Sequence, residues 1–194
     1  WLAGDGRVDA TCVHRGVSGC TLLLIAAEHG HKEIVELLLM RGAEADARDG
    51  EDHTALMAAA RWGYEQVAEM LLRHGAGINL QDSAGITALM AAAAKGHEQV
   101  ADVLLQHGAE INLQNSLACT ALMLAALYGH PAVVRRLLRA GADMRVRSSG
   151  MTALQFAKEK GHGECFEAFR TYLGEVAAAR SKAPSAEAGG AGAG

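Results

Sequence analysis

Aromatic residues are scarce in this sequence, at 4% of 194 residues, whereas Ala and Leu are abundant. This composition disfavours a sandwich of aromatic and β-branched strands and favours closely packed helices, so we expect an all-α protein. The four cysteines have neither paired nor CxxC spacing, which predicts reduced thiols in a cytoplasmic or nuclear protein. The longest apolar runs, around 84–94 and 117–127, are shorter than the roughly 18 to 20 residues of a membrane span, so we expect no membrane insertion.

Positive charge is not in excess, because the formal net charge is -4. We therefore do not expect nucleic acid as a partner. The sequence also lacks a P-loop, a GxSxG elbow, an HExxH motif and a GxGxxG motif next to a strand. These absences lead us to expect neither enzymatic activity nor a cofactor.

The chain contains a repeat that is marked by threonine and glycine. Five threonines follow one another at intervals of 33, 33, 33 and 32 residues, and a glycine lies nine residues after each of them. Thr is a preferred helix N-cap, and Gly readily adopts the left-handed conformation that ends a helix. Each repeat is therefore predicted to hold short helices. The threonines are Thr21, Thr54, Thr87, Thr120 and Thr152.

The apolar residues of the repeat support two helices per unit. In the second helix they fall at i, i+1, i+4 and i+5, as in Val67, Ala68, Leu71 and Leu72, which places them on one helical face. The first helix carries pairs of small residues that allow neighbouring repeats to approach closely. Most of the nine histidines also recur at fixed positions of the repeat, so we expect structural roles for them and no metal site.

Residues 54–82, TALMAAARWGYEQVAEMLLRHGAGINLQD, and residues 87–115, TALMAAAAKGHEQVADVLLQHGAEINLQN, resemble ankyrin repeats. The pattern of that family runs TPLHLAA, GH, LL, GAD and VN, and the resemblance covers about residues 1–173. It implies an elongated, curved α-solenoid of paired short antiparallel helices with β-turn fingers. It also implies a non-catalytic protein-protein interaction module that acts as a scaffold or adaptor. The sequence departs from the pattern where Pro and His are usual, since Ala and Met mostly replace them.

The repeat pattern predicts the domain organisation. We interpret residues 1–16 as the remnant of a preceding repeat and its finger, so the array is expected to continue upstream, where an enzyme domain is one alternative. Lys158 and Arg170 replace apolar residues of the other repeats, which indicates that the fifth repeat is a C-terminal cap. Residues 177–194 are biased towards Ala and Gly and are predicted to be a disordered tail. The five repeats span about 17–49, 50–82, 83–115, 116–147 and 148–176.

The resemblance implies that a protein partner binds the concave groove, at the finger tips and the ends of the first helices. Trp62 and Tyr128 are our preferred anchors, with Lys95 between them, because aromatic residues dominate interface energetics. For Ile86 and Met151, burial against neighbouring fingers is an equally good explanation. We expect the chain to be a monomer. The candidate partner-binding residues are Glu51, His53, Arg61, Trp62, Ile86, Lys95, Leu117, Leu127, Tyr128 and Met151.

A cluster of arginines offers an alternative function, the binding of a polyanion or a lipid headgroup. The competing explanation is a solvated surface, because two of these arginines fall on a finger and the others on a second helix. Salt would separate the two functions, since a polyanion complex weakens steeply with ionic strength. The candidate anion-binding residues are Arg135, Arg136, Arg139, Arg145 and Arg147.

The family resemblance also implies a modification site. Ankyrin repeats are often hydroxylated on the Asn of the finger, and Leu104, Glu110 and Asn112 match the usual spacing of Leu, acid and Asn. Asn112 is therefore a candidate for hydroxylation. The alternative is that this Asn only holds the finger turn.

Overall fold

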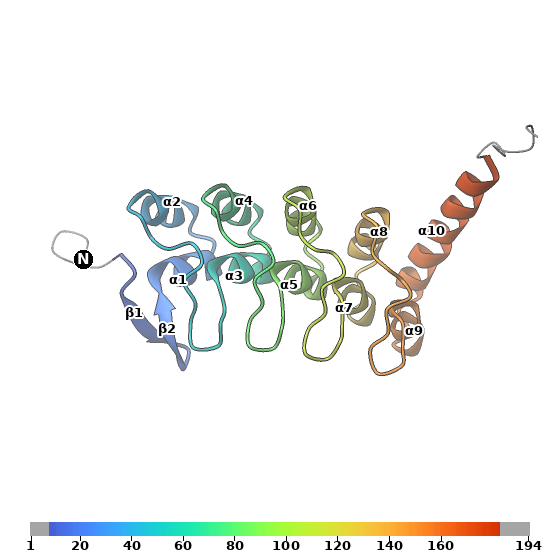
Figure 1. Cartoon of the computed structure of the whole chain (residues 1–194), viewed down its shortest axis with the longest axis horizontal. Helices are drawn as coiled ribbons and strands as arrows, with labels where there is room; N and C mark the ends of the chain where they lie inside the picture. The colour runs from blue at the N-terminus through green and yellow to red at the C-terminus, as the bar shows by residue number, and fades with distance from the viewer. Residues whose placement is uncertain (1–7, 183–194) are drawn as a thin grey trace, which may run out of the picture.

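The computed structural model describes residues 8–182, which form an elongated stack with two rows of helices (Figure 1). A hairpin of strands β1 (Thr11–His14) and β2 (Val17–Thr21) precedes the helices. One row holds the first helices of the repeats, α1 (Leu22–Glu28), α3 (Ala55–Trp62), α5 (Ala88–Lys95), α7 (Ala121–Leu127) and α9 (Ala153–Glu159). The other row holds the second helices, α2 (Lys32–Met40), α4 (Glu65–Arg73), α6 (Glu98–Gln106), α8 (Pro131–Arg139) and α10 (Gly163–Lys182).

The repeated threonines and glycines bound the first helices as the sequence predicts. Each of the five threonines accepts a hydrogen bond from a backbone amide in the first turn, as Thr54 does from Met57. Gly63 ends α3 with φ 81°. A Cβ at this glycine would lie 2.6 Å from Nδ1 of His97, whose Nε2 hydrogen-bonds to the Arg61 carbonyl oxygen at 3.1 Å. The glycine and the histidine of the repeat therefore join consecutive units.

The hydrophobic core runs along the whole stack, between the two rows of helices. Consecutive first helices pack against one another, and fully buried alanines such as Ala59 and Ala92 allow this close approach. Leu71, Leu104 and Leu137 occupy equivalent positions of the second helices and are 0% exposed. The apolar face that the sequence predicts is therefore the buried face.

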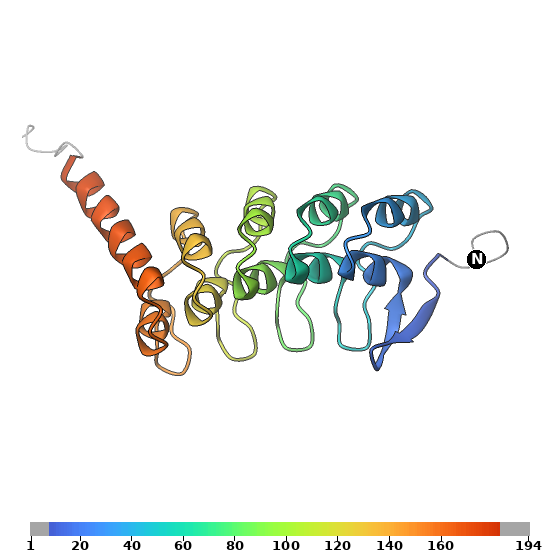
Figure 2. The ribbon, with the colours of Figure 1, turned by 180° about the vertical axis from the view of Figure 1, so that it is seen from behind.

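The fingers are the loops that join each second helix to the next first helix, and they lie side by side along one edge of the stack (Figures 1 and 2). Backbone hydrogen bonds link them: Gly50 N–H donates to Ser18 O, Ser83 N–H to Glu51 O, and Ser116 N–H to Ala84 O. Before α1, the hairpin of β1 and β2 takes the place of a finger, and in it Thr11 faces Thr21 and Cys12 faces Cys20. The helical solenoid thus carries a small β-hairpin at the start of its described part.

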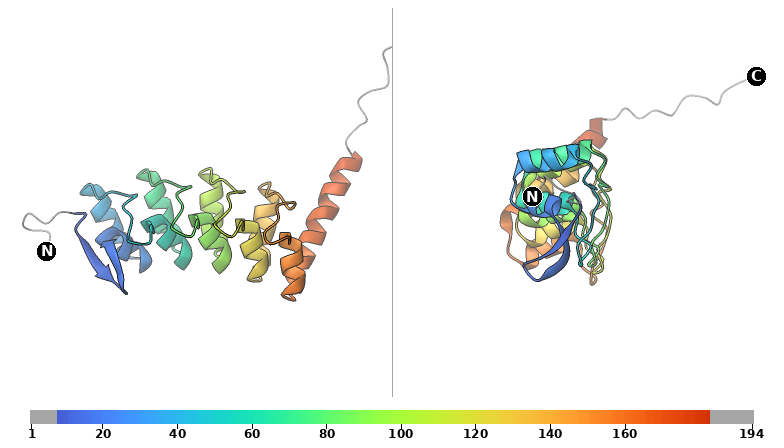
Figure 3. Two further views of the ribbon diagram at one scale, coloured as in Figure 1. Left: turned by 60° about the horizontal axis from the view of Figure 1, so that its bottom comes forward. Right: turned by 90° about the vertical axis from the view of Figure 1, so that its left-hand side faces the viewer.

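The two ends of the chain differ from the predicted boundaries or lie outside the described residues. Residues 177–182 belong to α10, so the prediction of a disordered tail is wrong there; Ala has the highest helix propensity, and the Ala-rich segment extends the helix. This end of α10 projects from the stack (Figure 3). The remaining tail, 183–194, and the start of the expected upstream remnant, 1–7, are not described. No helix within residues 8–182 is long and apolar enough to cross a bilayer.

Candidate functional site

Three large side chains lie at equivalent positions along the row of first helices. Trp62 is the last residue of α3, Lys95 is the last residue of α5, and Tyr128 caps the end of α7. Trp62 is 48% exposed and Tyr128 is 56% exposed. Lys95 is also exposed, while Leu127 is half-buried. The sequence-predicted row of an aromatic, a cation and a second aromatic residue is therefore available to solvent.

A hollow of about 270 Å³ lies between the hairpin, helices α1, α3 and α5, and the next two fingers. Its floor is apolar and includes Met57, Ala58 and Ala91. We call this feature the acidic hollow, because four carboxylates line it, those of Glu28, Asp49, Glu51 and Asp82. The structure brings five of the candidate partner-binding residues together in it, namely Glu51, His53, Arg61, Trp62 and Ile86.

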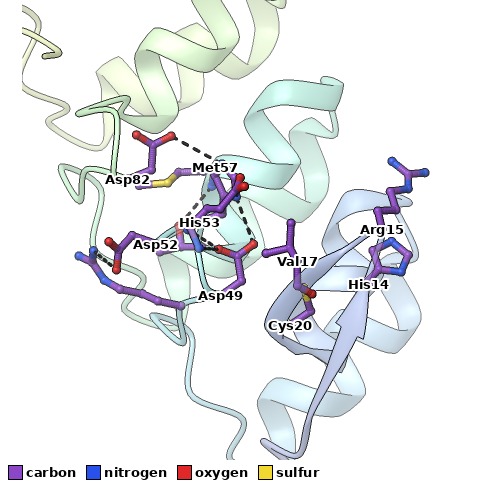
Figure 4. A network of polar contacts seen from close by, with 12 residues as sticks. His14, Arg15, Val17, Cys20, Asp49, Asp52, His53, Met57 and Asp82 are labelled. Carbon is purple, nitrogen blue, oxygen red and sulfur yellow. Dashed lines mark hydrogen bonds and ion pairs between the residues drawn. The ribbon is translucent and has the colours of Figure 1, made fainter.

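His53 lies at the centre of the polar contacts of the hollow (Figure 4). Its Nδ1 is 3.1 Å from Oδ2 of Asp49 and 3.8 Å from Oε2 of Glu51. Its Nε2 is 3.7 Å from Oδ2 of Asp82, which belongs to the next finger. One imidazole thus contacts three carboxylates from two consecutive fingers.

Backbone amides hold the two aspartates in place. Oδ1 of Asp49 accepts from the amides of Glu51 and His53, both at 2.9 Å. Oδ1 of Asp82 accepts in the same way from Ala84 at 2.9 Å and from Ile86 at 2.8 Å. Asn115 repeats this arrangement in the following finger, so the turn itself does not require a charge.

The remaining charged residues of the hollow come from the hairpin and from helix ends. Glu28 accepts a hydrogen bond from Arg15, and its Oε2 is 3.3 Å from His14 Nε2, without the alignment of a hydrogen bond. Arg61 is exposed at the rim, and no carboxylate of the described residues lies within ion-pair distance of it. The guanidinium groups of Arg15 and Arg61 therefore line the hollow together with the four carboxylates.

The other candidate residues lie further along the fingers. Leu117 is 72% exposed at the tip of its finger. Met151 is half-buried and pairs with Ser148 in an isolated bridge. Ile86 is half-buried and packs partly against the core while it also lines the hollow, so both explanations offered for this residue hold in part.

The five arginines do not form an unpaired basic patch. Arg136 contacts Glu98 and Asp102, each at 2.9 Å, and Arg139 contacts Glu175 at 3.2 Å.

Those on the finger are also engaged. The guanidinium of Arg145 hydrogen-bonds to Asp143 and lowers the pKa of that carboxyl group. Arg147 donates to the carbonyl oxygen of Gly150 at 2.6 Å. The remaining member of the cluster, Arg135, belongs to α8 and lies beside Glu164 and Glu167. Acids and carbonyl groups of the same chain thus surround this cluster.

Asn112 is exposed, and its side chain joins two fingers. Its Oδ1 accepts from the backbone amide of Asp143 at 2.9 Å. Asn79 makes the same bond to the amide of Glu110 at 2.9 Å and also donates to the Glu110 carboxylate at 3.1 Å. Asn112 therefore does hold the next finger, and its hydroxylation stays a prediction.

The sequence analysis did not identify the carboxylates of Asp49 and Asp82 as site residues. A signal was present, since Asp49 and Asp82 share their repeat position with Asn115 and Ser148. Among residues 8–182 no group of three or more His, Cys, Asp or Glu side chains has the arrangement of a metal site.

The stacked helix pairs define a helical-repeat solenoid. The family model described as ankyrin repeats (3 copies) matches residues 1–82, 23–115, 72–148 and 89–176. The chain therefore belongs to the ankyrin-repeat family, whose members are generally protein-protein interaction modules and typically non-catalytic. No curated protein matches this chain as a relative.

Proposed function

We propose that this chain is a non-catalytic module that binds a protein partner along the groove formed by the finger tips and the ends of the first helices. The observation that carries the proposal is the exposure of Trp62 and Tyr128 at equivalent positions of their repeats. Lys95 lies at the same position of the repeat between them. The residues that build the repeat are buried, so these side chains are not needed for the stack.

Interface energetics support this choice of anchors. Tyr and Trp are enriched among the few residues that dominate binding energies, because they bury a large area with few rotatable bonds. Leu117 adds an apolar side chain on the fingers of the same groove. The partner is therefore expected to cover both the helix ends and the finger tips.

Polyanion binding by the arginine cluster is the weaker alternative. Arg136, Arg139 and Arg145 each contact a carboxylate of the chain, and a polyanion would have to displace these acids. The two functions still predict opposite salt dependence, because binding through apolar anchors changes little with ionic strength whereas polyanion binding weakens steeply.

The test is to select binders from a displayed peptide library and to compare variants of the chain. Trp62→Ala and Tyr128→Ala should each weaken binding by roughly 2 kcal/mol or more without changing the thermal midpoint. Leu104→Ala should instead cost roughly 2 to 5 kcal/mol of stability, because it leaves a cavity in a fully buried position.

Met40→Ala is the matched control, since Met40 is 67% exposed but lies at the end of α2, in the other row. The control variant should bind as the unaltered chain does. The proposal fails if every selected peptide binds the Trp62 and Tyr128 variants unchanged.

A further inference from the structure

We infer that the acidic hollow receives a basic side chain, Arg or Lys, from the partner segment that lies in the groove. This inference rests on the proposed function and adds the chemistry of one anchor. It follows from the charge balance, the unfilled hydrogen-bonding capacity and the lining of the hollow.

The charge balance of the hollow is negative, because four carboxylates line it together with two guanidinium groups, those of Arg15 and Arg61. Asp49, Glu51 and Asp82 all lie within 3.8 Å of the His53 ring, and a single imidazole supplies at most one positive charge for three carboxylates. Arg15 contacts Glu28 instead. Grouped carboxylates raise one another's energy, and a cation placed among them lowers it.

Asp82 has unused hydrogen-bonding capacity in the hollow. Its side chain is only 9% exposed, and its Oδ1 is taken by two backbone amides. Its Oδ2 lies 3.7 Å from His53 Nε2, which is too long for a hydrogen bond. An ammonium or guanidinium group that enters the hollow supplies a charge-assisted hydrogen bond to this carboxylate oxygen.

The lining of the hollow suits the rest of a long basic side chain. Trp62 offers an aromatic ring, which attracts ammonium and guanidinium groups. Met57, Ala58 and Ala91 provide an apolar surface for the aliphatic stem. A volume of about 270 Å³ holds a side chain but not a helix.

The rest of the groove has a different character. Asn115 and Ser148 replace the two aspartates in the later fingers, where Leu117 and Tyr128 are exposed. The expected partner segment therefore carries a basic residue at the hollow and apolar residues beyond it. Acidic and phosphorylated segments are disfavoured, because their charge repels the carboxylates.

The test is to select peptides from a displayed random library on the whole chain and to sequence them. We expect Arg or Lys to be enriched at one position next to apolar residues. Binding of a selected synthetic peptide should weaken about tenfold when Asp82→Asn or Glu51→Gln is introduced, and about tenfold when the basic residue of the peptide is replaced by Gln. When the Asp82→Asn variant is combined with the Gln-substituted peptide, the loss of binding free energy should be less than the sum of the two separate losses, because the carboxylate and the basic residue contact each other.

Asp82→Asn retains the fold in this design, since Asn115 natively accepts the equivalent amides of Leu117 at 3.0 Å and Cys119 at 2.9 Å. Glu33→Gln, on the outer helix α2, is the matched charge control and should leave binding unchanged. Selected peptides without a basic residue would overturn the inference, as would basic peptides that bind the Asp82 and Glu51 variants normally. The proposed function survives either result if these peptides still require Trp62 and Tyr128. Both the proposed function and the inference fail if the peptides bind the Trp62, Tyr128, Asp82 and Glu51 variants unchanged.

Discussion

The two ends of the proposed groove are built from the same repeat, yet they carry different polar side chains. At one end Asp49 and Asp82 brace their fingers with a carboxylate, while at the other Asn115 braces its finger with an amide at nearly the same hydrogen-bond lengths. The turn needs an acceptor oxygen but not a charge. The charge at this position is therefore free to vary with function.

Both ends expose large aromatic or apolar side chains. Trp62 is 48% exposed at the acidic end, and Tyr128 and Leu117 are 56% and 72% exposed at the other end. The buried core beneath both ends is the same set of Ala and Leu positions. A partner therefore meets one continuous support with two kinds of surface.

The largest expected effect comes from removing the support at one end. Deletion of residues 152–194 takes away α9 and α10, including the fully buried Cys165 and the almost fully buried Phe169, and exposes the apolar flank of α7 and α8. The loss should exceed the roughly 3 to 5 kcal/mol of a single buried Phe truncation, and aggregation should follow. Chemical denaturation and light scattering measure both. Deletion of 183–194 alone is the length control, and an equal loss there would contradict the account.

A smaller effect should distinguish the joints between fingers at the two ends. Asn79→Ala removes two hydrogen bonds to Glu110, while Asn112→Ala removes one to Asp143. At about 0.5 to 1.5 kcal/mol per bond, the Asn79 variant should lose more stability than the Asn112 variant. Urea denaturation of the two variants side by side gives the comparison. Equal losses would mean that the exposed bond to the Glu110 carboxylate contributes nothing.

A still smaller effect on stability is expected when the neutral end is given the charge of the acidic end. Asn115→Asp keeps the acceptor oxygen for the amides of Leu117 and Cys119, so the free energy of unfolding should change by no more than about 0.5 kcal/mol at pH 7. Affinity for a basic peptide should rise, by up to about tenfold. Fluorescence anisotropy with one labelled peptide tests this. A strong destabilisation would show that charge at this position does affect the turn.

The least invasive test uses the thiols. Cys12 is exposed, whereas burial raises the pKa of Cys20 and raises that of Cys165 to about 11. Only about one Cys165 thiol in a thousand is then ionised at pH 8, so this residue should react most slowly with iodoacetamide and Cys12 should react first. Peptide mass spectrometry over time reads out the order. Early modification of Cys165 would mean that α10 opens far more readily than its packing suggests.

The repeat could be predicted from the sequence because its information is local. A Thr cap, a closing Gly and an apolar face lie within one helix pair, and the period then aligns the copies. The prediction failed for residues 177–182, because an Ala-rich segment reads as low complexity although Ala strongly favours a helix.

The acidic hollow is harder to predict, because its residues come from different repeats. His53 and Trp62 were identified as candidates, but the contact of His53 with Asp82 depends on how consecutive fingers stack. Glu28 joins the hollow through the hairpin residues His14 and Arg15, whose turn the period does not describe. Alignment of the finger positions would have shown the change from Asp to Asn, but not the imidazole between the carboxylates.

The bonds between neighbouring fingers bear on how tightly the hollow can bind. Gly50 is joined to Ser18 and Ser83 to Glu51 through the backbone, so the walls of the hollow are parts of one hydrogen-bonded edge. No single finger can swing outward without breaking its link to the next. In the proposed complex, the partner's side chain would enter a preorganised socket, because most of the entropy of ordering these fingers has already been lost on folding.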